Sequence, residues 1–297
     1  MTSAGHPWFV LACDHRRPHL AALLDRAGDP GPQDRPTIVA AKETIAAGFE
    51  RAVAEGVPAD AAGLLIDEEF GAAAARTAIA AGRVVAMPVE ASGLDHFALT
   101  DPAIVDRVLA LGPACVKALV RYNVEGDPDA NASSVTALTD LVERLPAGGP
   151  SLMLEVIVPP TPAQLAAAGD AEGFVRTRRA ALVARALTEL LAAGLEPDLW
   201  KVEGLDDPDD AARVADAARA AARPAGLVVL GAGAPTARVD TWLRVAAATP
   251  GYVGFAVGRS LWWDEIRALL AGRCMREAAT AAIAANFRHA VDVFTGA

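Results

Sequence analysis

The sequence predicts one α/β domain over residues 1–297, a closed (β/α)8 barrel of parallel strands surrounded by helices. Eight short runs rich in Val, Ile and Leu are almost continuously apolar, as strands that are covered on both faces should be. The stretches between them are Ala-rich and long enough for a helix, which is typical of βαβ units. An open, doubly wound sheet with fewer strands is the alternative, and the eight regular repeats favour the barrel.

Each strand is placed where an apolar run lies between turn or helix-cap signals. The expected strands are Trp8–Cys13, Gly63–Asp67, Val84–Val89, Cys115–Val120, Ser151–Val158, Leu199–Glu203, Leu227–Leu230 and Tyr252–Val257.

Helix-start and helix-stop signals lie between these runs. Thr100-Asp101-Pro102 and Asp206-Asp207-Pro208 each offer a capping side chain and a proline for the first turn. Gly56 and Gly194 are suitable helix stops. We expect a loop over the barrel top at Gly28–Pro36 and helices at Pro36–Glu55, Phe174–Ala193, Asp209–Ala222 and Trp263–Phe294, the last holding the eighth barrel helix and one more.

The charge balance and the cysteines limit the classes of partner. The 297 residues include 27 basic and 37 acidic side chains, a net charge of −10, which argues against nucleic acid and anionic membranes as partners. Cys13, Cys115 and Cys274 are too few for a disulfide framework and lack the paired spacing of a zinc site. Met1–Pro7 shows no signal-peptide pattern, and no apolar stretch is long enough to span a membrane. We therefore expect a cytoplasmic protein that binds a small molecule. The sequence is compatible with a homo-oligomer as well as with a monomer.

Ionisable residues gather where the expected strands end. In a barrel of this kind the active site lies at the C-terminal ends of the strands, so these side chains should meet there. Because side chains alternate along a strand, Lys201 and Glu203 share one face, and so do Lys117 and Arg121. Asp67, Glu90 and Glu203 are expected substrate contacts at strand ends, and Asp14 and Arg16 also follow a strand end.

The chain has only three lysines against 24 arginines. Lys42 falls in a helix, where we expect it to be solvated, but Lys117 and Lys201 lie inside strands, where a charge needs a polar cavity or a partner. A buried ion-pair network with Glu155 is the structural alternative. Buried ion pairs favour arginine, however, so two lysines retained in strands indicate that a titratable amine is needed.

An amine whose pKa is lowered by burial and by a neighbouring cation can attack a ketone and form a Schiff base. Lys201 has the more apolar neighbours and is favoured over Lys117 as the nucleophile. Glu155 and Lys117 are placed to transfer protons. The sequence therefore predicts that Lys201, Glu155 and Lys117 are catalytic.

Glycines follow the seventh and eighth strands, where barrels often bind phosphate. Gly231, Gly233 and Gly258 let backbone N–H groups approach an anion, and Arg259 adds a bidentate partner. A dinucleotide-binding loop is disfavoured because Thr236 stands where its third glycine would be, and no cofactor is expected. No metal site is expected from the five histidines, which are His6, His15, His19, His96 and His289.

Seven segments at strand ends also carry a resemblance to a known family: Asp14-His15-Arg16, Leu65–Gly71, Glu90–Gly93, Val116–Leu119, Leu154–Val156, Trp200–Glu203 and Gly258–Trp262. In this order they resemble the class I, tagatose-bisphosphate-aldolase-like enzymes. The chain looks closest to the aldolase-like domain that is often fused behind 5-dehydro-2-deoxygluconokinase in myo-inositol catabolism.

The resemblance implies a Schiff base on Lys201, with Glu155 and Lys117 transferring protons and orienting the carbonyl group. It also implies that Asp14 and Arg16 contact the substrate. The implied reaction is the reversible cleavage of a phosphorylated keto-sugar acid. For the closest relatives, 2-deoxy-5-keto-gluconate 6-phosphate gives glycerone phosphate and malonate semialdehyde. The implied phosphate clamp is Arg259 with the loop Gly231–Gly233.

This chain departs from the bisphosphate aldolases of that group after the third strand. Ala91 and Leu94 stand where those enzymes carry a more basic segment, which argues against a second phosphate on the substrate. Two other functions are considered beside the Schiff-base aldolase: a catalytically silent barrel that binds sugar phosphates, and a zinc-dependent aldolase.

Overall fold

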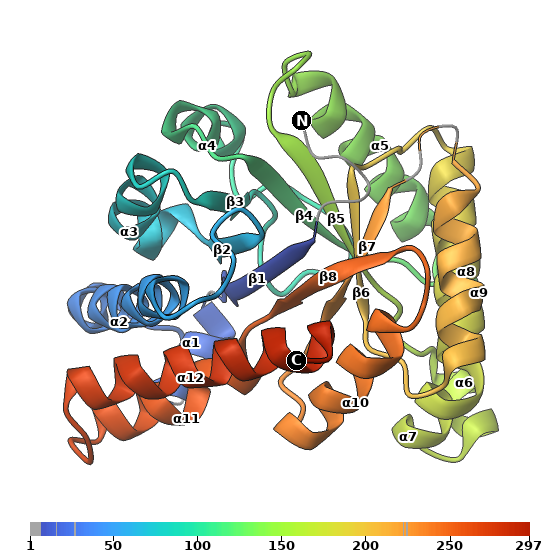
Figure 1. Ribbon diagram of the computed structural model, residues 1–297. Coiled ribbons are helices and arrows are strands. Elements are labelled where there is room, and N and C mark those ends of the chain that lie inside the picture. Colours follow the sequence, from blue (N-terminus) through green and yellow to red (C-terminus); the bar gives the residue numbers. More distant parts are fainter. Residues whose placement is uncertain (1–6, 16, 27, 222, 224) are drawn as a thin grey trace.

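The computed structural model describes residues 7–15, 17–26, 28–221, 223 and 225–297, which fold into a (β/α)8 barrel (Figure 1). Eight parallel strands close the barrel in chain order, with β8 paired to β1. The closed barrel confirms the predicted fold class. The strands are β1 (Trp8–Cys13), β2 (Ala62–Ile66), β3 (Val84–Pro88), β4 (Cys115–Arg121), β5 (Ser151–Ile157), β6 (Leu199–Glu203), β7 (Gly226–Leu230) and β8 (Tyr252–Val257).

The predicted strand bounds agree with these to within one residue at each end. β1, β6 and β8 match their predicted bounds. Asp67, predicted to end the second strand, lies just outside β2. It caps the next helix instead, with its carboxylate accepting from the Phe70 N–H at 2.8 Å.

The helices surround the barrel and cover its outer face (Figure 1). A 3₁₀ turn, Pro32–Asp34, lies within the predicted loop Gly28–Pro36. The helices are α1 (Arg17–Leu23), α2 (Arg35–Ala54), α3 (Glu68–Ala80), α4 (Ile104–Leu111), α5 (Pro128–Arg144), α6 (Pro162–Ala168), α7 (Ala171–Phe174), α8 (Ala180–Ala192), α9 (Pro208–Arg219), α10 (Thr236–Ala247), α11 (Arg259–Leu270) and α12 (Arg276–Thr295). None of them, among the described residues, is long and apolar enough to cross a membrane.

Several helix boundaries follow the predicted signals. Asp207 caps α9, accepting from the N–H groups of Asp209 and Asp210. Gly56 and Gly194 lie two residues beyond the last residues of α2 and α8 and have positive φ values of 119° and 85°, which favour glycine.

Other helix predictions were wrong in detail. α4 begins at Ile104, beyond the predicted cap at Thr100-Asp101-Pro102, because the Asp101 carboxylate accepts from Ala103 in a turn that precedes the helix. The helix predicted at Phe174–Ala193 starts with a π-helical turn, Val175–Arg179, before α8. α11 begins directly after β8, four residues earlier than the predicted Trp263.

Side chains inside the barrel change from apolar to charged toward the C-terminal ends of the strands. The apolar layer includes Trp8, Val10 and Ala12 of β1, all buried. Side chains two positions further along share the same inward face. The apolar residue is followed by a charged one at Cys115 and Lys117, Met153 and Glu155, and Leu199 and Lys201.

Candidate active site

A cavity of about 400 Å³ opens above this charged layer, at the C-terminal ends of the strands. Almost every predicted site residue that the structure describes lies on its wall. The members are Asp14, Glu90, Lys117, Glu155, Lys201, Glu203, Gly231, Gly233, Gly258 and Arg259.

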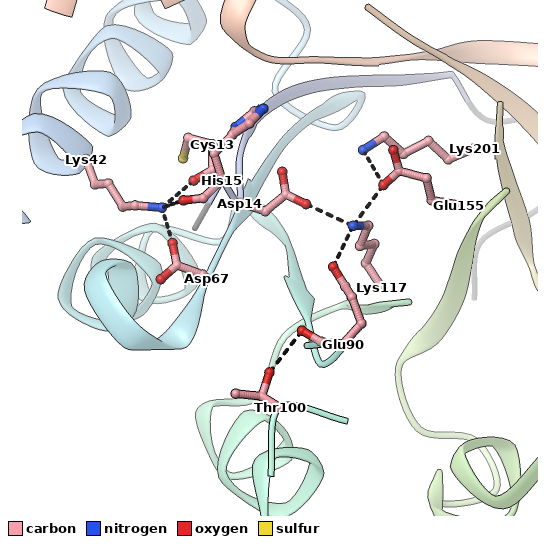
Figure 2. A network of polar contacts seen from close by, with 10 residues as sticks. All are labelled: Cys13, Asp14, His15, Lys42, Asp67, Glu90, Thr100, Lys117, Glu155 and Lys201. Atoms are coloured by element: carbon pink, nitrogen blue, oxygen red, sulfur yellow. Dashed lines mark hydrogen bonds and ion pairs between the residues drawn. The ribbon is translucent and has the colours of Figure 1, made fainter. Parts of the chain in front are cut away.

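Lys117 on β4 lies among three carboxylates at the base of the cavity (Figure 2). Its Nζ is 2.8 Å from Glu90 Oε1, 2.8 Å from Glu155 Oε2 and 3.1 Å from Asp14 Oδ2. The carboxylates come from three further strand ends, so the ammonium ties four segments of the barrel together. A buried ammonium with three acceptors has each of its N–H groups satisfied.

Lys201 on β6 shares a carboxylate oxygen with Lys117. Its Nζ is 3.0 Å from Glu155 Oε2, the oxygen that Lys117 also contacts. The barrel register explains the contact, because Glu155 and Lys201 are direct partners on β5 and β6. Both side chains are buried, and the Lys201 ammonium faces the cavity.

Electrostatics fixes the charge of this cluster. Burial alone would lower the pKa of Lys117, but Glu155, Glu90 and Asp14 outweigh burial and raise it. Burial alone would raise the pKa of Asp14 and of Glu155, but the two ammonium groups hold both pKa values below their usual range. At neutral pH, Lys117 is therefore protonated and the two carboxylates are ionised.

Glu203, two residues beyond Lys201, has a different environment. Burial raises its pKa, and the nearby Arg179 guanidinium offsets part of that effect. Arg179 lies in the π-helical turn and donates to Glu203 Oε1 at 3.0 Å and to the Gly204 carbonyl oxygen at 2.7 Å. The turn thus fixes a carboxyl group at the cavity wall that is more easily protonated than Asp14 or Glu155.

The glycine-rich side of the cavity is built around Arg259, the first residue of α11. Its guanidinium donates to the Ala232 carbonyl oxygen at 3.0 Å and lies over Gly233. A Cβ atom at Gly233 would come within 2.9 Å of Arg259 Cζ, and φ there is +74°, so both space and backbone favour glycine. Within the described part of the chain, no carboxylate forms an ion pair with Arg259. An arginine without a counter-ion at a helix N-terminus suits an anion.

Four cationic or ionisable side chains on the wall were not among the predicted site residues: His15, His19, His96 and Arg121. The alternation that places Lys117 inside the barrel also places Arg121 there, so strand periodicity alone could have identified it. The His15 ring packs edge-on against His19 and Trp262, and burial lowers its pKa, which leaves it neutral. The sequence could not predict this packing, because Trp262 on α11 is distant from His15 in the chain and only the closed barrel brings the two rings together.

The loop after β3, which holds the departures from the bisphosphate aldolases at Ala91 and Leu94, also lines the cavity. It contributes Ala91, Ser92, Gly93, Leu94 and His96, and the pairing of Glu90 with Leu99 closes it at its base.

Two predictions need correction. Lys42, expected to be solvated, is buried, and its ammonium contacts the Asp67 carboxylate and the carbonyl oxygens of Cys13 and His15 (Figure 2). The reason is that α2 packs along the strand ends and turns this residue inward. Asp67, predicted to contact the substrate, does not line the cavity, because its carboxylate is engaged by Lys42 and by α3. Arg16 lies outside the described residues.

No group of three or more His, Cys, Asp and Glu side chains in the described ranges is arranged to hold a metal ion.

Comparisons with known proteins agree with the fold. A family model described as "Uncharacterized protein conserved in bacteria (DUF2090)" matches residues 3–297. No match was found among curated proteins. Among solved structures, the crystal structure of an archaeal fructose 1,6-bisphosphate aldolase is similar, with a TM-score of 0.57 and 15% sequence identity over 99% of this chain and 95% of that chain. At this identity the likeness shows the barrel fold.

Proposed function

The chain belongs to the DUF2090 family, and we propose that it is a class I aldolase that cleaves or forms a carbon–carbon bond of a phosphorylated keto-sugar through a Schiff base on Lys201. The observation that carries the proposal is the buried pair of lysines on one carboxylate oxygen, with Lys201 Nζ at 3.0 Å and Lys117 Nζ at 2.8 Å from Glu155 Oε2. The solved archaeal aldolase of the same fold supports it.

Lys201 is the better nucleophile of the two. Lys117 contacts three carboxylates, which raise its pKa and keep it protonated and therefore without a lone pair. Lys201 contacts one carboxylate oxygen and shares it with Lys117, so Glu155 is a nearby acceptor for its proton.

In the proposed reaction, Glu155 accepts a proton from the Lys201 ammonium, and the amine attacks the ketone carbon. The carbonyl oxygen takes up two protons and leaves as water, and a protonated imine remains. A base then removes the proton of the hydroxyl group two carbons away, the carbon–carbon bond breaks, and its electron pair moves into the imine to give an enamine. The aldehyde product leaves. Protonation of the enamine carbon and addition of water release the ketone product and restore the lysine.

Glu155 and Lys117 have different roles in the proposed reaction. Glu155 is ionised and lies against Lys201, which suits the acceptor role. Lys117 stays charged and provides a fixed positive charge that orients the substrate oxygen. Asp14, Glu90 and Glu203 are further groups on the wall for the hydroxyl groups of a sugar.

We place the phosphate of the substrate beside Arg259 and the loop Gly231–Gly233. The arginine, the two positive-φ residues Ala232 and Gly233 and the start of α11 form a basic corner of the cavity. Within the class I aldolases we propose the tagatose-bisphosphate-aldolase-like group. The first substrate to test is 2-deoxy-5-keto-gluconate 6-phosphate, a compound of myo-inositol catabolism, and the second is fructose 1,6-bisphosphate.

Turnover of these two compounds and of related ketose phosphates tests the proposal. The wild-type chain should release an aldehyde from one of them, in buffer with or without a metal chelator. Lys201→Met should abolish turnover and still be stabilised against heat by the substrate. Activity that disappears with the chelator would favour a zinc-dependent aldolase. Thermal stabilisation of the wild type without turnover of any compound would favour a silent sugar-phosphate-binding barrel.

A further inference from the structure

Lys42 is the third lysine of the chain and lies outside the cavity, yet it is buried as deeply as the two lysines within it. Its Nζ on α2 donates to the Cys13 carbonyl oxygen at 2.6 Å and to the His15 carbonyl oxygen at 3.1 Å, and it forms an ion pair with Asp67 (Figure 2). Three donors meet three acceptors, so the buried charge is fully satisfied.

The two carbonyl groups flank Asp14, which contacts Lys117 in the cavity. The strand ladders have ended at this point, because β1 pairs with β8 as far as Leu11 and with β2 as far as Cys13. Asp14 therefore lies just beyond the sheet. The hydrogen bonds from Lys42 hold the backbone on both sides of Asp14, at a point beyond the last ladder pairs of β1 with β2 and β8.

Asp67 connects this anchor to a second element. Its carboxylate neutralises Lys42 and also caps α3 through the Phe70 N–H. The end of β1, the end of β2 and the start of α3 are thus held by one ammonium group. An apolar residue of similar size could fill the same space, and such replacements of buried ion pairs are often neutral for stability. What the apolar residue could not do is donate hydrogen bonds to the two carbonyl groups.

We propose that Lys42 is a positioning residue: it fixes the backbone around Asp14 and so sets the distance between the Asp14 carboxylate and Lys117. The effect on turnover rests on the proposed aldolase function, whereas the effect on the backbone does not. The two parts of the proposal are tested by separate measurements.

The backbone is tested by hydrogen exchange at the amides of Asp14 and His15. In Lys42→Met, exchange there should be at least about tenfold faster than in the wild type, relative to amides in the distant strands. The matched control is Arg83→Met, which removes another ion pair of α2, between Arg83 and Glu50, that lies away from the cavity. The control should exchange at Asp14 and His15 as the wild type does. Unchanged exchange in Lys42→Met overturns the proposal, whether or not the chain is an aldolase.

Turnover is tested by a double-mutant cycle with Asp14→Asn. If Lys42 acts through Asp14, Lys42→Met lowers kcat by about tenfold or more, and the double variant is no slower than the slower single variant. Trapping of a ketone on Lys201 by borohydride should persist in Lys42→Met. Independent effects, with the two losses multiplying, overturn the role in turnover. Absence of turnover and trapping in the wild type contradicts the proposed function and leaves the exchange result standing.

A buried methionine opposite a charged Asp67 can prevent folding, because it leaves an unpaired carboxylate. Lys42→Met/Asp67→Asn removes both charges and keeps an acceptor for the cap of α3. Both measurements are made on this variant if the single variant does not fold, with the same expected results and the same contradicting ones.

Discussion

At the scale of single residues, two lysines balance three carboxylates in the cavity, and the proposed chemistry depends on this balance. Lys117 alone contacts Asp14, Glu90 and Glu155, and Lys201 adds one contact to Glu155. All three lysines of the chain are buried, and two of them, Lys42 and Lys117, have three acceptors each.

Removing Lys117 should reverse the pH dependence of stability. In the wild type, Asp14 and Glu155 have lowered pKa values, so their contribution to stability is present above a pH of about 4 and is lost as the pH falls further. In Lys117→Met, burial dominates and raises both pKa values, so ionisation opposes folding. We expect the variant to unfold at a temperature roughly 3 °C or more higher at pH 5 than at pH 8. Thermal melts at both pH values check this, and a wild-type-like pH profile would contradict it.

Gly233 should matter for phosphate binding more than for chemistry. In Gly233→Ala, the new methyl group would press on Arg259 and strain the positive-φ backbone. We expect KM for the phosphorylated substrate to rise about tenfold or more, with a smaller change in kcat. Gly28→Ala, which meets nothing within 4 Å, is the control and should behave as the wild type. Equal KM values for Gly233→Ala and Gly28→Ala would contradict a phosphate site beside Gly233 and Arg259.

The residue scale is also where sequence reasoning was weakest. Lys117, Glu155 and Lys201 could be predicted to face one cavity, because strand periodicity fixes the face of each side chain. The burial of Lys42 could not be predicted, because the pattern of a helix does not show how deeply a single lysine side chain is buried against neighbouring elements. Asp67 was misassigned because a strand-end carboxylate can cap the next helix as well as contact a substrate.

At the scale of elements, strands were more predictable than helices. A strand buried on both faces is a continuous apolar run with abrupt ends, whereas a helix boundary depends on which of several polar groups forms the cap. α4 shows this, since Asp101 forms a turn with Ala103 and the helix starts later, at Ile104. The π-helical turn before α8 has no sequence signal of this kind, yet it places Arg179 on Glu203.

One strand contact depends on a glycine. At Gly254 on β8 the backbone approaches β1 so closely that a Cβ atom would lie 1.9 Å from the Trp8 carbonyl oxygen, and φ is +156°. The ladder between β7 and β8 also shifts register here, between Leu227 and Val228. Gly254→Ala should therefore lower the free energy of unfolding by about 2 kcal/mol or more, measured by urea denaturation. Gly28→Ala again serves as the control, and equal stability of the two variants would refute the close approach.

At the scale of the whole molecule, the barrel explains why residues far apart in the chain form one site. Strand ends from Asp14 to Arg259 meet around one cavity because the eight strands close in order. The repeat of strands and helices in the sequence was enough to predict this closure. The proposed chemistry rests on two strands, β5 and β6, whose register places Lys201 beside Glu155.

The most direct test of the central claim is reduction with borohydride in the presence of the ketose phosphate that the chain turns over, followed by mass mapping of the labelled peptide. We predict one covalent adduct per chain, on Lys201, and none in Lys201→Met. Lys117→Met should still form the adduct on Lys201, more slowly because the neighbouring charge is lost. An adduct on Lys117, or turnover that persists in Lys201→Met, would contradict the account.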